Sequence, residues 1–168
     1  CCNMDRIMRV ARKNKLLVIE DNAQACGGKY KGKFLGAIGD MGCFSISTFK
    51  ITGGGEAGLV LTNNEWFHIR ATSQHDTAAC WRPDRYAKER RPGELFCGMN
   101  FRLSELEGAV NLIQLKKTEA QANRYRTNMQ RISAGLRPFE RTRLRRPLGW
   151  DGGEGSARRR CRRRHRPR

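Results

Sequence analysis

The chain has 168 residues, 38% of them hydrophobic, and a formal net charge of +18 from 34 basic and 16 acidic residues. This length allows one domain with a modest core, and no apolar run approaches the roughly 20 residues of a membrane-spanning helix. The first ten residues carry charge where a signal peptide would be apolar, and because residue 1 is Cys rather than Met, we expect a missing N-terminus.

The first predicted elements are a helix and a strand. Residues 4–15 place apolar side chains at helical spacing opposite Arg and Lys, which predicts an amphipathic helix. Residues 16–21, LLVIED, form a short apolar run that ends in two acids, as expected for a buried parallel strand. A helix that leads into such a strand is half of a βαβ unit. Residues 27–40 are rich in glycine and predict a small turn or hairpin.

Two further strands, 42–47 and 59–62, flank a connection that contains Lys50 and a run of glycines. An Asn cap then predicts a short helix at about 64–72. Residues 73–98 mix polar, aromatic and proline residues without a period, which favours a long functional or interface loop.

The last predicted element is a helix from about residue 105 to 132. Ser104 and Glu107 form an S-x-x-E capping box ahead of it. Leu106, Val110 and Ile113 then recur on one face. Residues 1–136 are therefore expected to form the folded part of the chain.

Residues 137–168 differ sharply in composition from the rest. They contain 13 Arg, no Lys and three acidic residues, a net charge of +10, whereas residues 1–136 carry +8. Such a segment predicts a disordered basic tail, and a tail translated out of the original reading frame is one interpretation of it. Because Arg runs neutralise phosphates, a nucleic-acid-binding arm is the alternative.

The seven cysteines are odd in number and show no C-x-x-C spacing. With three histidines, no zinc-ligand pattern can be written. We interpret the cysteines as buried free thiols of a protein in the reducing cytoplasm.

One constellation could carry chemistry. Asp21 ends a predicted parallel strand and should face the crevice where α/β sheets bind ligands, and Lys50 follows the next strand. A lysine that forms a Schiff base to a pyridine cofactor needs a carboxylate at the ring nitrogen and hydroxyls at the phosphate. Ser45, Ser47 and Thr48 could supply those hydroxyls. The simpler alternatives are a turn-forming Asp and a solvated loop Lys.

The segments LLVIEDNAQACGGKYKGKFLGAIGDMGCFSISTFKITGGGEAGLVLTNNE and GMNFRLSELEGAVNLIQLKK resemble the DegT/DnrJ/StrS family of nucleotide-sugar aminotransferases, which depend on pyridoxal 5'-phosphate (PLP). The resemblance covers roughly residues 4–132. It implies an α/β fold: part of the large domain of a fold type I transferase, three-layered around a mostly parallel sheet, and incomplete here.

The resemblance implies a role for five residues. Lys50 would form the Schiff base and then move the proton in a 1,3-shift. Asp21 would pair with the pyridinium nitrogen, and Gln24 would lie against the ring. Ser45 would bind the cofactor phosphate, and Asn100 would reach it from the neighbouring subunit of a homodimer.

The implied reaction is ping-pong transamination from an amino donor, usually glutamate, to a keto group of a nucleotide-linked sugar. Lys50 argues against the dehydratase-like branch of the family, in which histidine replaces it. Arg102 is expected to be structural or interfacial, and His75 matches too loosely for a role. Ala57 stands where the family usually has glycine, which suits a negative φ only. As an internal fragment, the chain is expected to be inactive or weakly active. The alternatives to this function are a basic nucleic-acid-binding protein, through the Arg-rich tail, and a non-catalytic remnant.

Overall fold

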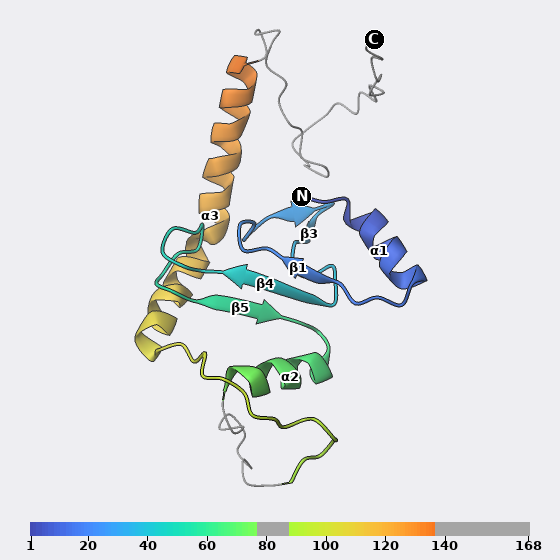
Figure 1. The fold of residues 1–168 in the computed structure, drawn as a ribbon. Coiled ribbons are helices and arrows are strands. Elements are labelled where there is room, and N and C mark those ends of the chain that lie inside the picture. The colour runs from blue at the N-terminus through green and yellow to red at the C-terminus, as the bar shows by residue number, and fades with distance from the viewer. Residues whose placement is uncertain (77–87, 137–168) are drawn as a thin grey trace, which may run out of the picture.

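The computed structural model describes residues 1–76 and 88–136. Three helices and five short strands make up this part of the chain (Figure 1). In order they are α1 (Met4–Lys13), β1 (Ile19–Asp21), β2 (Lys29–Tyr30), β3 (Lys33–Phe34), β4 (Met41–Ser45), β5 (Gly58–Leu61), α2 (Glu65–His75) and α3 (Glu105–Leu136). The mixture of helices and strands is the α/β organisation that the sequence predicts.

A three-stranded sheet in the order β1-β4-β5 lies at the centre of the fold. β1 runs parallel to β4, with Asp21 opposite Cys43, and the backbone N–H of Asn22 extends this ladder by donating to the Cys43 carbonyl (2.8 Å). β5 pairs antiparallel with β4 and places Gly58 opposite Ser45. The parallel pairing expected for residues 16–21 is therefore confirmed, while the second described pairing of the sheet is antiparallel.

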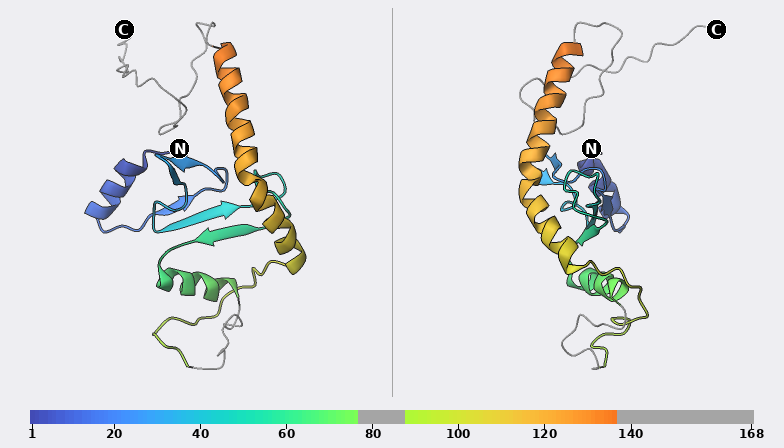
Figure 2. Two further views of the ribbon diagram at one scale, coloured as in Figure 1. Left: turned by 180° about the vertical axis from the view of Figure 1, so that it is seen from behind. Right: turned by 90° about the vertical axis from the view of Figure 1, so that its left-hand side faces the viewer.

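Helices lie on both sides of the sheet. Seen with the strands edge-on, α3 lies to one side of them and α1 to the other (Figure 2). The connection between β4 and β5, which contains Lys50, lies beside α3 (Figure 1). This layered arrangement is the frame that positions the candidate site.

The apolar residues at the start of β1 are exposed, so their predicted burial is wrong for this chain. Leu16, Leu17 and Ile19 have 60%, 66% and 64% of their surface exposed. Leu16 and Leu17 lie before β1, and the described residues leave the side of β1 that carries Ile19 uncovered. The sheet thus presents apolar surface that the described residues do not cover.

Glu20, between these exposed residues and Asp21, points the other way and is 7% exposed. Its carboxylate accepts three backbone hydrogen bonds, from Gly36 (2.8 Å), Ile38 (2.7 Å) and Gly39 (2.6 Å). A buried charge is tolerated when it is fully hydrogen-bonded in this way. Glu20 thereby ties the turn at residues 36–39 to β1.

The β2–β3 hairpin confirms the hairpin expected within residues 27–40 and packs against α1. Tyr30 is buried, and its hydroxyl group donates to Asn3 Oδ1 (3.3 Å). Lys31 forms an ion pair with Asp5 of α1. The hydrogen bond from Lys31 lowers the pKa of the Asp5 carboxyl group below its usual value of 3.8.

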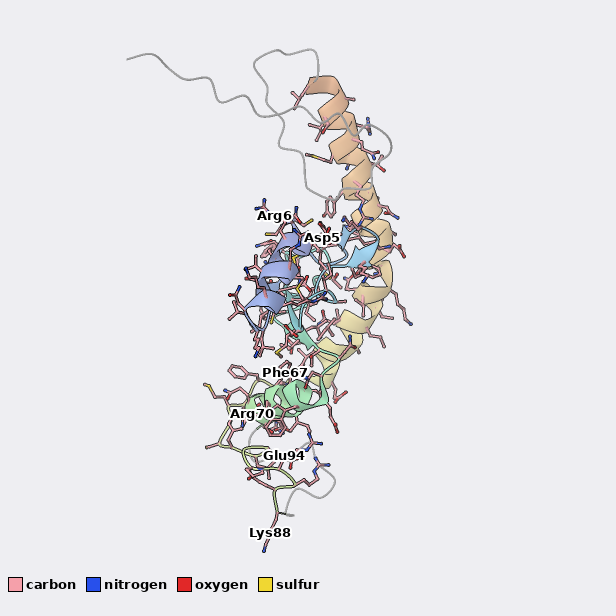
Figure 3. The ribbon with its side chains drawn as sticks, turned by 90° about the vertical axis from the view of Figure 1, so that its right-hand side faces the viewer. Asp5, Arg6, Phe67, Arg70, Lys88 and Glu94 are labelled. Carbon is pink, nitrogen blue, oxygen red and sulfur yellow. The ribbon has the colours of Figure 1, made fainter. Side chains whose placement is uncertain are left out.

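α2 begins at the predicted Asn64 cap, whose Oδ1 accepts from the backbone N–H of Phe67 (3.1 Å). The helix continues to His75, so the loop expected from residue 73 begins later. Residues 88–98 run along α2 (Figure 3), where the Ser73 hydroxyl group donates to the Glu94 carbonyl (2.9 Å). The rest of that predicted loop, residues 77–87, lies outside the described residues.

α3 confirms the predicted capping box but buries a different face. The Ser104 hydroxyl group accepts from Glu107 N (3.2 Å) and donates to its carboxylate (2.8 Å). The side chains that recur on the predicted apolar face are exposed: Leu106 (77%), Val110 (43%) and Ile113 (50%). The buried residues are instead small or polar: Asn111, Thr118 and Ala122. The apolar face of α3 that the sequence predicts for the core is exposed, because hydrogen bonds from polar side chains set the orientation of the helix.

Two predictions about composition can be compared with the fold. Within residues 1–76 and 88–136, no helix is both long and apolar enough to cross a membrane. The described cysteines are free thiols, but Cys1, Cys2 and Cys97 are exposed, so the expectation of burial is wrong for these three. Cys26 and Cys43 are half-buried.

Candidate functional site

Asp21 and Ser45 lie at the carboxyl ends of two adjacent parallel strands. Asp21 is the last residue of β1 and stands opposite Cys43, so Ser45 follows two residues further along β4 at the same edge of the sheet. Asp21 is exposed, and its Oδ1 accepts from the backbone N–H of Ala23 (3.1 Å), which fixes the carboxylate. The carboxyl edge of parallel strands is where α/β sheets bind ligands.

Lys50 follows at that same edge, in a compact turn that we call the lysine turn (residues 47–54). Lys50 N donates to the Ser47 carbonyl (2.9 Å), and the Lys50 carbonyl accepts from Gly53 N (3.0 Å). A Cβ atom at Gly53 would lie 2.2 Å from the Thr48 carbonyl oxygen, so this position requires glycine. Lys50 is half-buried. The turn therefore fixes the backbone of Lys50 beyond the end of β4.

The chain leaves the lysine turn through Ala57, where the resemblance predicts glycine. Lys15 and Lys31 are the non-glycine residues with positive φ in the described part of the chain, so Ala57 has a φ that alanine adopts without strain. Its carbonyl accepts from Ile46 N (2.9 Å), which closes the strand pairing at this end.

Gln24 follows Asp21 by three residues in the chain, whereas Asn100 lies on a distant segment. Gln24 is exposed in the turn that follows β1, where Ala25 N donates to the Asn22 carbonyl (2.9 Å). Asn100 is exposed in the segment before α3, and its Oδ1 accepts from the backbone N–H (3.1 Å) and Nε (3.3 Å) of Arg102. The structure thus brings Asp21, Ser45 and Lys50 to one edge and leaves Asn100 on a separate segment.

Arg102 lies at the C-terminal end of α2, whose last residue is His75. Arg102 Nε lies 3.5 Å from Oδ1 of Asp76, a residue that is only 6% exposed. The backbone carbonyl of His75 accepts from Phe101 N (2.9 Å). These contacts hold the segment before α3 against α2 and agree with the structural role expected of Arg102.

The sequence did not predict the role of three polar residues, one in the lysine turn and two on α3 beside it. Thr52, in the turn itself, is 1% exposed and bonds to Thr118 on α3 through their hydroxyl groups (2.8 Å). Asn111, also on α3, donates through Nδ2 to the Gly54 carbonyl (3.3 Å). Both α3 residues are polar and lie about a third of a turn around the helix from the apolar residues that define the predicted face, which is why hydrophobic periodicity gave no signal for them.

The residues at this edge fit a PLP cofactor. Such a cofactor requires an amine for its aldehyde carbon, a carboxylate for its ring nitrogen and hydrogen-bond donors for its phosphate. Lys50, Asp21 and Ser45 are of these three types and lie at one edge of the sheet.

Comparison with known proteins gives an independent view of the same region. Residues 1–150 match the DegT/DnrJ/EryC1/StrS aminotransferase family. The GDP-perosamine synthase of Caulobacter vibrioides is 37% identical over 123 residues, which cover 70% of this chain and 30% of that protein. The family match extends to residue 150, beyond the boundary expected at residue 136. Residues 137–150 lie outside the described residues.

Solved structures resemble the described fold. An aminotransferase from Psychrobacter cryohalolentis is 38% identical, with a TM-score of 0.59 over 70% of this chain and 31% of that one. A DegT/DnrJ/EryC1/StrS aminotransferase from Brucella abortus is 26% identical, with a TM-score of 0.70 over 82% of this chain and 35% of that one. The chain spans about a third of the length of the curated relatives it matches.

Proposed function

Because the chain belongs to the DegT/DnrJ/EryC1/StrS aminotransferase family, we propose that it is part of a PLP-dependent enzyme that aminates a nucleotide-linked keto-sugar. The observation that supports this most directly is the shared position of Asp21 and Ser45 at the carboxyl edge of β1 and β4, with Lys50 in the turn that follows. Such a set of groups has no evident use in a plain connection between strands.

Each residue at this edge has a definite task in the proposal. PLP supplies an electron sink when it is bound. The Asp21 carboxylate would hold a proton on the ring nitrogen, and the Ser45 hydroxyl group would donate to the phosphate. Lys50 Nζ would hold the cofactor at its aldehyde carbon and would serve as the base that moves a proton during the reaction. Gln24 would contact the ring.

The names of the relatives guide the choice of substrates. One relative is a GDP-perosamine synthase, and an L-glutamine:2-deoxy-scyllo-inosose aminotransferase of Streptoalloteichus tenebrarius is 33% identical over 146 residues. The first name describes the synthesis of a nucleotide-linked amino sugar, and the second names L-glutamine as the amino donor. We assign a nucleotide-linked keto-sugar as acceptor in line with the first name, and glutamate as the amino donor in line with the family resemblance of the sequence.

The proposal includes a homodimer in the cytoplasm. Asn100 is exposed on a segment apart from the other site residues, which suits a residue that completes the site of a neighbouring subunit. The free thiols of Cys26 and Cys43 suit a reducing compartment. Light scattering after gel filtration measures the mass, and a strictly monomeric protein that binds PLP would contradict the assignment of Asn100.

The test is a titration of the purified chain with PLP, followed by visible absorption. Attachment of the cofactor to a lysine creates a visible band that free PLP bound elsewhere lacks. The proposal expects this band in the wild type, its loss in Lys50→Ala, and its retention in the matched control Lys116→Ala, which changes an exposed lysine of α3. A band that survives Lys50→Ala, or that never forms in the wild type, would refute the proposal.

A further inference from the structure

One helix contacts both turns that carry the proposed cofactor residues. Thr118 of α3 joins the lysine turn through the 2.8 Å contact between its hydroxyl group and that of Thr52. The Thr52 hydroxyl group lies in turn 3.2 Å from Cys26 Sγ. Cys26 belongs to the turn after β1, residues 21–27, which we call the acid turn because it begins at Asp21. A short polar chain therefore links α3, the lysine turn and the acid turn.

Two further hydrogen bonds reinforce this link along α3. Asn111 Nδ2 donates to the Gly54 carbonyl in the lysine turn (3.3 Å), and Arg126 Nη2 donates to the Gly27 carbonyl in the acid turn (2.9 Å). Asn111 and Arg126 lie on either side of Thr118, about four helical turns apart. Because one helix is a stiff element, these contacts set the separation of the two turns.

The contacts between α3 and the turns are buried and closely packed. Thr52 is 1% exposed and Thr118 is 8% exposed. Gly27 adopts a positive φ (76°), and a Cβ atom there would lie 3.3 Å from Thr118 Cγ2. Water cannot readily replace a hydrogen bond in such a place, so loss of one hydroxyl group leaves a buried partner less satisfied.

A hydrogen bond within the lysine turn closes the segment from Lys50 to Gly53, which contains Thr52, so a contact that holds Thr52 also constrains the Lys50 backbone. Lys50 is two residues from Thr52, and its own N–H and carbonyl are bonded within the turn, to Ser47 (2.9 Å) and Gly53 (3.0 Å). We propose that Thr118 is a positioning residue: it acts through Thr52 to hold the Lys50 amine at a fixed place relative to Asp21. This inference rests on the proposed function of Lys50.

The test compares attachment of PLP to Lys50 with binding of pyridoxine 5'-phosphate, which carries the phosphate and ring but has no aldehyde to attach. Thr118→Val removes the hydroxyl group at nearly constant volume, Thr118→Ser keeps it, and Thr127→Val is the matched control at an exposed threonine of α3. Attachment of PLP is measured by the visible absorption band, and binding of pyridoxine 5'-phosphate is measured by its dissociation constant. Far-UV circular dichroism checks that all variants fold.

We expect Thr118→Val to weaken attachment of PLP by about twofold to tenfold, the effect of one hydrogen bond, while its affinity for pyridoxine 5'-phosphate stays within twofold of wild type. Thr118→Ser and Thr127→Val should match the wild type in both. Unchanged attachment in Thr118→Val would overturn the inference, and so would an equal loss of PLP and analogue, which indicates a merely structural role.

Hydrogen exchange separates failure of this inference from failure of the proposed function. Without cofactor, the amides of Lys50, Gly53 and Gly54 should exchange about twofold to tenfold faster in Thr118→Val than in Thr118→Ser. If wild type attaches no PLP, the proposed function fails, and with it the assignment of a catalytic amine that Thr118 positions. Equal exchange rates in Thr118→Val and Thr118→Ser would refute the proposed link between Thr118 and the lysine turn, whether or not PLP attaches to Lys50.

Discussion

Glu20→Gln replaces a single heavy atom of the side chain, but we expect it to destabilise the fold strongly. The carboxylate is buried, and its two oxygens divide three donors: Oε2 accepts from Gly36 N, whereas Oε1 accepts from Ile38 N and Gly39 N. Glutamine has the same shape but offers one oxygen and one NH₂ group. Whichever way the amide is turned, at least one backbone N–H faces another donor.

The magnitude follows from the number of bonds lost. If the amide oxygen keeps the Ile38 and Gly39 bonds, one charge-assisted hydrogen bond to Gly36 disappears, and the loss is about 1.5–3 kcal/mol. The two remaining bonds also become neutral and weaker. We therefore expect the free energy of unfolding to fall by about 2–4 kcal/mol, a large part of the stability of a small domain.

Urea unfolding of both proteins, followed by circular dichroism, measures this difference through the shift of the midpoint at constant slope. The matched control is Glu119→Gln, whose exposed carboxylate lies 3.7 Å from Lys29 Nζ. An exposed pair contributes about 0–1 kcal/mol, so its midpoint should hardly move. Equal midpoints for Glu20→Gln and Glu119→Gln would refute the reasoning that Glu20 is a buried structural anchor.

Three further changes have expected outcomes. Gly53→Ala should lower the unfolding temperature, because its Cβ atom would lie 2.2 Å from a backbone carbonyl oxygen. In the control Gly108→Ala the new Cβ atom meets nothing within 4 Å, so this change should be neutral or raise stability by up to about 1 kcal/mol. Calorimetry measures both. Asn64→Ala should cost about 1 kcal/mol in urea unfolding through loss of the α2 cap, and a change under a few tenths would contradict that role. The pKa of the Asp5 carboxyl group is lowered by the hydrogen bond from Lys31, so this pair stabilises the fold above the ordinary pKa of Asp and the contribution is lost as pH falls through the lowered value. Carbon-detected NMR should show the pKa of Asp5 rising toward its usual value in Lys31→Ala, and an unchanged titration would contradict the ion pair.

The parts of the fold that depend on local signals are predictable from the sequence. Asn64 and the pair Ser104 and Glu107 mark the starts of α2 and α3 where the structure has them. The parallel pairing of β1 follows from its apolar run, and that pairing places Asp21 and Ser45 at one edge. Short-range capping and strand patterns are encoded within a few residues, which is why they can be found in one sequence.

The contacts that depend on packing between distant segments are not predictable in this way. Leu106 and Ile113 form an apolar row, yet α3 turns Asn111 and Thr118 inward because these side chains bond to the lysine turn 57 to 66 residues earlier in the chain. Nothing in the local pattern distinguishes a threonine that faces solvent from one that meets Thr52. The exposure of Ile19 likewise depends on which strands cover β1.

Peptide mapping after reduction tests the central claim most directly. The chain is incubated with PLP, reduced with borohydride so that an attached cofactor becomes a stable pyridoxyl group, digested, and analysed by mass spectrometry. The account predicts the added mass on the peptide that contains Lys50, with the other lysines modified only at the level of a denatured control. Modification spread evenly over surface lysines such as Lys116, with no preference for Lys50, would contradict it.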